Sequence, residues 1–360
     1  MPSRARPESP LESFSCTSER HSASGQVARK TAKTDRPRPD AHVWYADGDI
    51  VIIAQETVFR VHKSVVARHS KALECMFQPI SWGGQADLTN TFDGLPTVRV
   101  TDTAYDFKHF LLVVYDGFPR DKDPHTVVDF GVFAAWLRIG HRYRVPSFVI
   151  EGLRGFRSIF PMDLDTWDKH RFDGKFLHPR VVFDNTNAIE AVNAIRLAGK
   201  VHLLPGALYM CAQLRPSTLL AGTTRADGTP EKLGAADLLL CFEMKERLRK
   251  AEARIAVQWA AQDHVESRCK NFGDHCDRTR HELLKEACRN IHNNLRGDPL
   301  HGGVITRLHE VDDGWQLCSH CHDAMTWEVR GLRRALWNKL PVYAGVEADI
   351  RNWGKSTQGY

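Results

Sequence analysis

The pattern of apolar and polar residues between positions 47 and 77 predicts two strands followed by a helix. Residues 50–53 form an apolar run of β-branched side chains, which is typical of a buried strand. A polar break follows, and residues 58–61 then alternate as expected for the returning strand of a hairpin. From Val65 to Phe77, apolar residues recur at steps of three and four, which predicts a helix with one buried face.

The same pattern identifies the core of this segment. Large apolar residues of the returning strand and of the helix stripe fall where burial is expected. These predicted core residues are Phe59, Val61, Leu73, Met76 and Phe77.

Further elements are predicted after residue 90. Residues 97–101 form a short strand pattern, and apolar residues between Phe107 and Tyr115 give the next helix its stripe. Two more helices are expected at 133–145 and 148–160, and Pro161 ends the second. Strands and helices therefore occur together in one unit, which indicates the α+β class.

The motif F-x-V-H-K-S-x-V-x-x-x-S-x-x-L-x-x-M-F over residues 59–77 resembles the heart of a BTB/POZ domain. Three further segments resemble a large group of fungal BTB proteins most: GLPTVRVTD, YDG and LRIGHRYRV. The resemblance covers about residues 40–161. It implies a short mixed sheet capped by helices, followed here by a mainly α-helical domain. It also implies contacts with other proteins and no chemistry of the domain's own.

The resemblance also implies candidate interaction residues. BTB domains carry an Asp at the start of the first strand and a basic residue just after the His that follows the hairpin, and here these are Asp49, Lys63 and His62. From the residues alone, Asp49 and Lys63 are equally a surface pair worth no more than ~1 kcal/mol, and His62 is expected to be a hydrogen-bonded structural residue rather than a catalytic one. Homodimerisation through this domain is a further expectation, although residues 1–40 are too polar for the extra helix that long-form members exchange.

Composition divides the chain of 360 residues into more than one unit. A polar tail over 1–40 has too few large apolar residues to order. We expect the BTB-like domain over 41–161, a linker over 162–179, a mainly helical domain over 180–345 and a C-terminal tail over 346–360. The helices predicted in the second domain cover 188–198, 205–214, 235–242, 244–261, 282–295 and 329–340.

Length and charge narrow the class of protein further. No run of 18 apolar residues is present, and the N-terminus lacks the apolar stretch of a secretory signal. We therefore expect no membrane span and an intracellular location, in the cytoplasm, the nucleus or both. The net charge of +5 is mild and is not gathered into a basic stripe, so direct nucleic-acid binding is not expected.

Enzyme motifs break off before they are complete. His281-Glu282 begins a zincin signature, but Lys285 stands where the second histidine is required. Gly354-Lys355-Ser356 imitates the end of a P-loop, but Asp349 stands where the earlier glycine is required. We therefore expect no catalytic residues.

Cysteine and histidine are concentrated near the C-terminal end. Five of the nine cysteines and eight of the eighteen histidines lie between residues 264 and 322. Cys318-x-x-Cys321 has the spacing that presents two thiolates to one tetrahedral ion, and Cys269 with Cys276 completes a set of four. The sequence predicts a structural Zn²⁺ held by these four cysteines, with Cys288 in the core of a helix instead.

Two alternatives to that site stay open. His275, His320 or His322 can substitute for a cysteine ligand, or the four cysteines are ordinary free thiols beside surface histidines.

Three functions follow from these expectations. The first is a non-enzymatic adaptor that joins a client to a larger complex such as a cullin-type ubiquitin ligase. The second is a nuclear regulator that recruits chromatin partners. The third is a metal-stabilised enzyme in the C-terminal domain.

Overall fold

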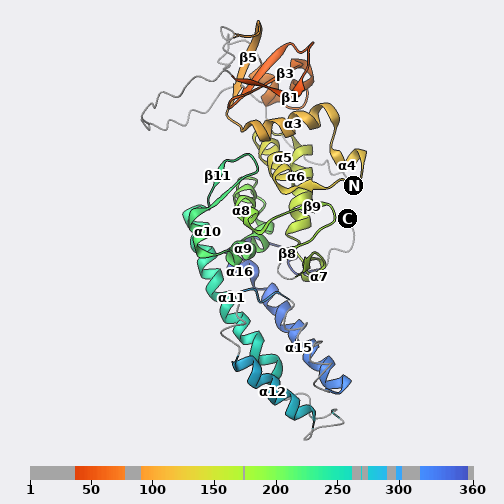
Figure 1. Cartoon of the computed structure of the whole chain (residues 1–360), viewed down its shortest axis with the longest axis vertical. Helices are drawn as coiled ribbons and strands as arrows, with labels where there is room; N and C mark the ends of the chain where they lie inside the picture. Colours follow the sequence, from red (N-terminus) through yellow and green to blue (C-terminus); the bar gives the residue numbers. More distant parts are fainter. Residues whose placement is uncertain are drawn as a thin grey trace, which may run out of the picture. The chain divides into compact units, whose positions relative to one another are not determined.

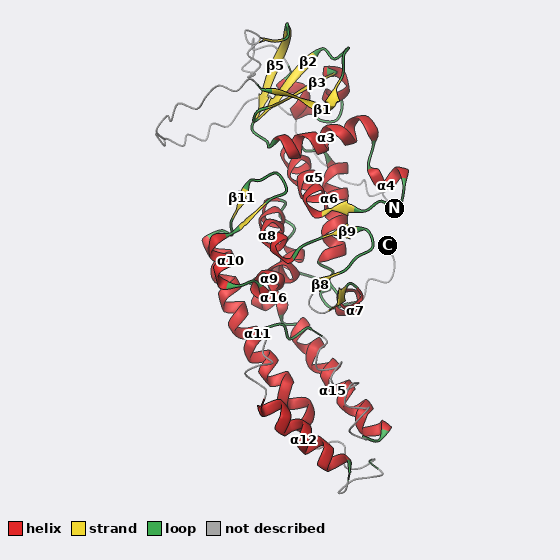
Figure 2. Cartoon of the chain, viewed as in Figure 1, coloured by secondary structure: helices red, strands yellow, loops and turns green. Residues whose placement is uncertain are grey.

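The computed structural model describes residues 37–77, 91–172, 175–261, 269, 275–289, 297–301 and 317–355 (Figures 1 and 2). The chain divides into two compact units, Met1–Tyr115 and Asp116–Tyr360. The first unit contains a five-stranded sheet with helices and the second is mainly helical, so the predicted α+β class is confirmed.

In its described residues, 37–77 and 91–115, the first unit combines one mixed sheet with three helices. The sheet has the strand order β1-β3-β2-β5-β4. β2 pairs with β3 antiparallel and with β5 parallel, β1 pairs with β3 parallel, and β4 pairs with β5 antiparallel. The elements are β1 (Arg38–Trp44), β2 (Ile50–Ala54), β3 (Thr57–Val61), α1 (Lys63–Ala67), α2 (Lys71–Met76), β4 (Thr91–Phe92), β5 (Leu95–Val100) and α3 (Ala104–Asp116).

The predicted hairpin is present and central. All five residues of β2 are buried, because this strand lies between β3 and β5 and has no free edge. Ala54 pairs with Thr57, so only Gln55 and Glu56 form the turn, and Gln55 adopts a φ of 53°. A positive φ at the first turn residue suits the twist of a two-residue hairpin.

The single helix predicted from Val65 to Phe77 is instead two helices. α1 ends at Ala67, and α2 begins after Ser70, whose side chain accepts hydrogen bonds from the backbone N–H groups of Ala72 and Leu73. A serine that caps a new helix competes with continuation of the old one. The apolar spacing survives this break, which is why periodicity alone did not reveal it.

The predicted core residues of this unit differ in burial. Phe59, Val61, Leu73 and Phe77 are buried, and Phe59 lies against Phe107 of α3. Met76 is only half-buried. Because α2 is a separate short helix, its buried stripe runs through Leu73 and Phe77 and leaves Met76 at the margin.

The sheet has two strands that the sequence pattern did not predict, β1 and the two-residue β4. β1 begins at Arg38, so residues 38–40 of the expected polar tail belong to the sheet, while residues 1–36 lie outside the described residues. Of the seven β1 residues only Val43 is buried, which is typical of an edge strand. A strand with one buried residue gives no alternating apolar signal.

The second unit is built from helices joined by short two-stranded pieces. Those strand pairs are β6–β9, β7–β8 and β10–β11. The elements up to residue 231 are α4 (Pro119–Lys122), β6 (Val128–Asp129), α5 (Phe130–Arg142), α6 (Pro146–Ile159), α7 (Leu164–Lys169), β7 (Arg171–Phe172), β8 (Lys175–Phe176), β9 (Val181–Val182), η2 (Asn185–Asn187), α8 (Ala188–Leu197), η3 (Val201–Leu203), α9 (Leu204–Gln213), α10 (Pro216–Ala221), β10 (Thr223–Thr224) and β11 (Pro230–Glu231). The later elements are α11 (Ala235–Ala261), α12 (Cys276–Arg289), α15 (Ser319–Trp337), α16 (Leu340–Tyr343) and η4 (Glu347–Asp349).

The boundary between the units falls earlier than the expected domain end at residue 161. α5 and α6 pack against each other, and α5 also packs against α8, which the sequence placed in the next domain. An ion pair between Arg138 of α5 and Glu190 of α8, 2.5 Å long, joins the two helices. The side chains of Arg138 and Glu190 are 12% and 2% exposed, so each charge compensates the other, and separating the two helices within the protein interior would leave a buried charge unpaired.

Two segments predicted to be a linker and a tail are packed structure. Trp167 of α7 lies in the expected linker and is 2% exposed. It meets Trp337 of α15 at a ring distance of 5.2 Å, and Trp353 of the expected tail stacks on Trp337 at 5.0 Å. The sequence neighbours of Trp167 and Trp353 are mostly polar, so composition alone did not predict that these segments are packed.

Helix boundaries in the second unit also differ from the predictions. α11 is continuous over the two segments predicted as separate helices, and α15 begins ten residues before the predicted start at 329. α12 covers Cys276–Arg289 and not 282–295, of which residues 290–295 lie outside the described residues. Within the described residues, no helix is both long enough and apolar enough to cross a membrane.

We predict that Phe77→Ala destabilises the first unit more than Met76→Ala does. Phe77 is 4% exposed, so its truncation should lower the free energy of unfolding by about 3–5 kcal/mol. Met76 is half-buried and should cost clearly less. Urea denaturation of each variant measures the difference, and equal losses would show that α2 packs through another face.

Candidate metal centre

The four predicted cysteine ligands lie at the ends of three segments of the second unit. Cys276 is the first residue of α12, Cys318 is the N-cap of α15, and Cys321 lies in the first turn of α15. Cys269 comes from the segment between α11 and α12. α11 packs against both α12 and α15, which brings these helix ends together (Figure 1).

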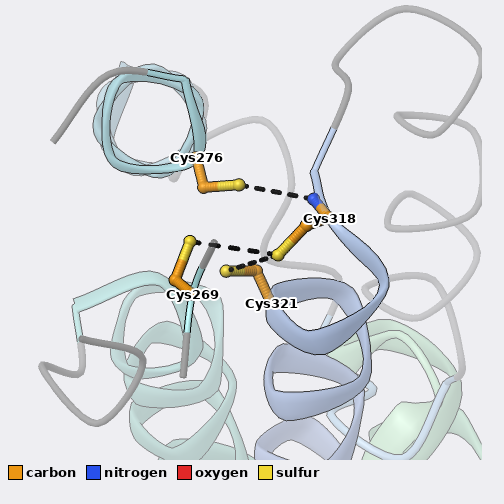
Figure 3. A group of neighbouring side chains, drawn as sticks. All are labelled: Cys269, Cys276, Cys318 and Cys321. Atoms are coloured by element: carbon orange, nitrogen blue, oxygen red, sulfur yellow. Dashed lines mark hydrogen bonds between the residues drawn. The ribbon is translucent and has the colours of Figure 1, made fainter. Parts of the chain in front are cut away.

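The sulfur atoms of the four cysteines converge on a common space (Figure 3). The Sγ atoms of Cys318 and Cys321 are 3.4 Å apart, and those of Cys269 and Cys318 are 3.9 Å apart. All four Sγ atoms lie within 4.8 Å of one another. Bonds of ~2.3 Å from zinc to sulfur place the sulfurs of a tetrahedral site ~3.8 Å apart, so the spacing fits a Zn²⁺ ion.

The surroundings of the cluster are enclosed. Cys276 and Cys321 are 3% and 2% exposed, and Leu317 and Ala324 pack against them. A cavity of about 10 Å³ borders three of the cysteines, which is space for one small particle and no more. Two of the four sulfurs are therefore shielded from solvent, whereas Cys269 and Cys318 are half-buried.

The electrostatics of the cluster favour ionisation of one cysteine and disfavour ionisation of all four. Burial opposes ionisation of Cys318, but hydrogen bonds from the backbone N–H of Cys321 and from neighbouring thiols outweigh it and lower the pKa of Cys318 to about 7. Burial raises the pKa of Cys276 and Cys321. Four thiolates at this spacing repel one another, so only a cation in their midst makes full ionisation favourable.

The fold adds two backbone features that suit negative sulfur. α12 and α15 both begin at the cluster, and the N-terminal end of a helix carries partial positive charge. The backbone N–H of Cys318 also points at the Sγ of Cys276, 3.3 Å away. Such N–H···S contacts orient the sulfurs and stabilise their charge.

The structure separates these ligands from the alternatives left open by the sequence. Among the described residues, the group that can share one ion consists of Cys269, Cys276, Cys318 and Cys321, without His275, His320 or His322. Cys288 is exposed, so its expected place in a helix core is wrong. The buried face of α12 runs instead through Cys276, Thr279 and Leu283, because the helix begins at the cluster and is rotated relative to the predicted stripe.

The interaction candidates of the first unit lie together at the end of the β2–β3 hairpin. Asp49 accepts a hydrogen bond of 2.7 Å from the backbone N–H of Lys63, and so caps α1. The ring of His62 contacts the Tyr115 hydroxyl at 3.1 Å through Nδ1 and the Asp47 carboxylate at 3.3 Å through Nε2. Asp49 and His62 therefore have structural roles, whereas Lys63 is exposed.

No family model, curated protein or solved structure matches the chain. The resemblance to BTB/POZ domains therefore rests on the motif in residues 59–77 and on the strands and helices that follow it.

We predict that the purified protein holds about one zinc ion per chain. Cys318→Ser and Cys276→Ser should each lower the zinc content severalfold, because a tetrahedral thiolate site loses a quarter of its ligands. Cys288→Ser is the matched control, since this exposed thiol lies outside the cluster and should leave the content unchanged. Elemental analysis measures all three, and less than a tenth of a zinc per wild-type chain would contradict the assignment.

Proposed function

We propose that the protein is a non-enzymatic interaction protein whose second unit is held by a structural Zn²⁺. The observation that carries the metal part is the enclosed group of Cys269, Cys276, Cys318 and Cys321. Four sulfur ligands fill the tetrahedral positions of zinc, so no position is left for a water or a substrate. This supports a structural ion over the metal centre of an enzyme.

The adaptor part is supported by the first unit. The motif resembling BTB/POZ domains spans β3, α1 and α2, and the strand β2 before it and the strand β5 after it stand in the expected order. We propose that this unit contacts another protein, and that a cullin-type ligase or a chromatin complex is the class of partner. Lys63 is the residue of the motif best placed for contact, because its side chain is exposed while its backbone is fixed by Asp49.

A chelator separates the role of the metal from the rest of the chain. Removal of zinc should loosen the ends of α12 and α15, because binding of a structural ion is coupled to folding of the segments that hold it. Hydrogen exchange should increase in 276–289 and 319–325 and stay unchanged in 50–61. If chelation leaves the hydrogen-exchange protection of 276–289 and 319–325 unchanged, no structural ion is bound here.

Charge reversal at Lys63 tests the adaptor proposal. Lys63→Glu should reduce capture of a cullin or chromatin partner severalfold without changing stability, because the side chain is exposed. Lys122→Glu, an equally exposed site in the second unit, is the control. The measurement is quantitative mass spectrometry of proteins bound to the immobilised full chain. If neither class of partner is recovered by the wild type, or both variants behave alike, the proposal fails.

A further inference from the structure

α15 carries an aromatic residue that nothing in the described part of the unit covers. Trp327 is 74% exposed, the highest value among the exposed large hydrophobic residues that the structure describes. Tryptophan dominates the centres of protein interfaces because it buries much area at low entropic cost. The opposite side of the helix packs inward through Met325, Val329 and Leu336, so α15 presents a distinct outer face.

A gap follows Trp327 on that face. Gly331 stands one turn later, is exposed, and has no heavy atom within 4 Å of the place where a Cβ would stand. Residues at i and i+4 lie above one another on a helix, so the tryptophan and the gap are neighbours. Because Gly331 has no side chain, the side chain of another molecule can approach the helix backbone closely there.

Charges on either side of this pair make the face complementary to itself. Asp323 lies one turn before Trp327, and Arg334 lies just under one turn after Gly331, and both are exposed. Arg334 reaches Asp165 at 3.6 Å, but both side chains are about two-thirds exposed, so this pair is weak and can exchange. Acidic, aromatic, small and basic residues thus follow one another along the outer face.

We propose that the outer face of α15 binds a second copy of this chain, with the two α15 helices antiparallel. In that arrangement Trp327 enters the gap at the partner's Gly331, and the partner's Trp327 enters the gap at Gly331. Asp323 then lies beside the partner's Arg334, and Arg334 beside the partner's Asp323. A parallel arrangement would oppose equal charges at both positions, which disfavours it.

The symmetry of this contact accounts for the choice of partner. A twofold interface uses the same patch on both copies, so each attraction occurs twice. One helix of 19 residues offers a contact at the low end of specific interfaces, so the association should be weak and depend on concentration. It uses other residues than the zinc proposal, and the C-terminal end of α15 is fixed by Trp337. Asp323 lies in the part of α15 that zinc loss should loosen, so association is measured on the untreated, zinc-loaded chain.

Two charge reversals used together test this arrangement. The full chain is labelled with donor or acceptor fluorophores at its N-terminus, and energy transfer is measured over a range of concentrations. Asp323→Arg alone and Arg334→Asp alone should each weaken self-association about tenfold, because each replaces two attractions by two repulsions. A mixture of the two variants should associate as well as the wild type, since both contacts become attractive again.

Variants of the central contact complete the test. Trp327→Ala and Gly331→Leu should each weaken association at least tenfold, the first by removing the knob and the second by filling the hole. Leu239→Ala is the control, because Leu239 is also exposed (60%) but lies on α11. Circular dichroism checks that each variant is folded. The proposal is overturned if the mixed charge variants do not regain association, or if Trp327→Ala associates as strongly as the wild type. Neither outcome depends on what the first unit binds.

Discussion

The position of α15 depends on the burial of Trp337. This side chain is fully buried and contacts the rings of Trp167 and Trp353, and its indole N–H donates to the carbonyl of Met162. Three segments far apart in the chain are joined by these contacts. Aromatic pairs at such distances contribute about 0.5–1.5 kcal/mol each beyond the burial of their area. The C-terminal end of α15 is therefore fixed by packing, and its N-terminal end is left to the cysteines.

The N-terminal end of α15 lies at the four cysteines, which come from segments far apart in the sequence. Cys269 and Cys318 are 49 positions apart, and closing a flexible loop of that length costs roughly 3–4 kcal/mol. Structural zinc sites contribute about 10–16 kcal/mol of apparent binding free energy in small peptides, which exceeds this cost. Leu317 and Ala324 also pack against Cys276 and Cys321. The ion that we propose would offset the cost of closing this loop.

Local signals predicted this site and the central hairpin well. Cys318-x-x-Cys321 is a local spacing, and the excess of cysteine before it supplied the other two ligands. The β2–β3 hairpin was predictable because a run of β-branched residues needs no distant information. Cys288 was misplaced for the opposite reason: the rotation of α12 depends on what its first residue contacts across 42 positions of sequence, from Cys276 to Cys318.

Features that depend on distant partners were not predictable. The break at Ser70 leaves the apolar spacing intact, β1 has one buried residue, and Trp167 stands among polar neighbours. The unit boundary shifted from 161 to 115 because Arg138 of α5 needs Glu190 to be buried at all. A charged residue on an otherwise apolar helix reads as a surface position until its partner is known. Periodicity finds the faces of helices, whereas only the pairing of buried charges and aromatic rings decides which faces meet.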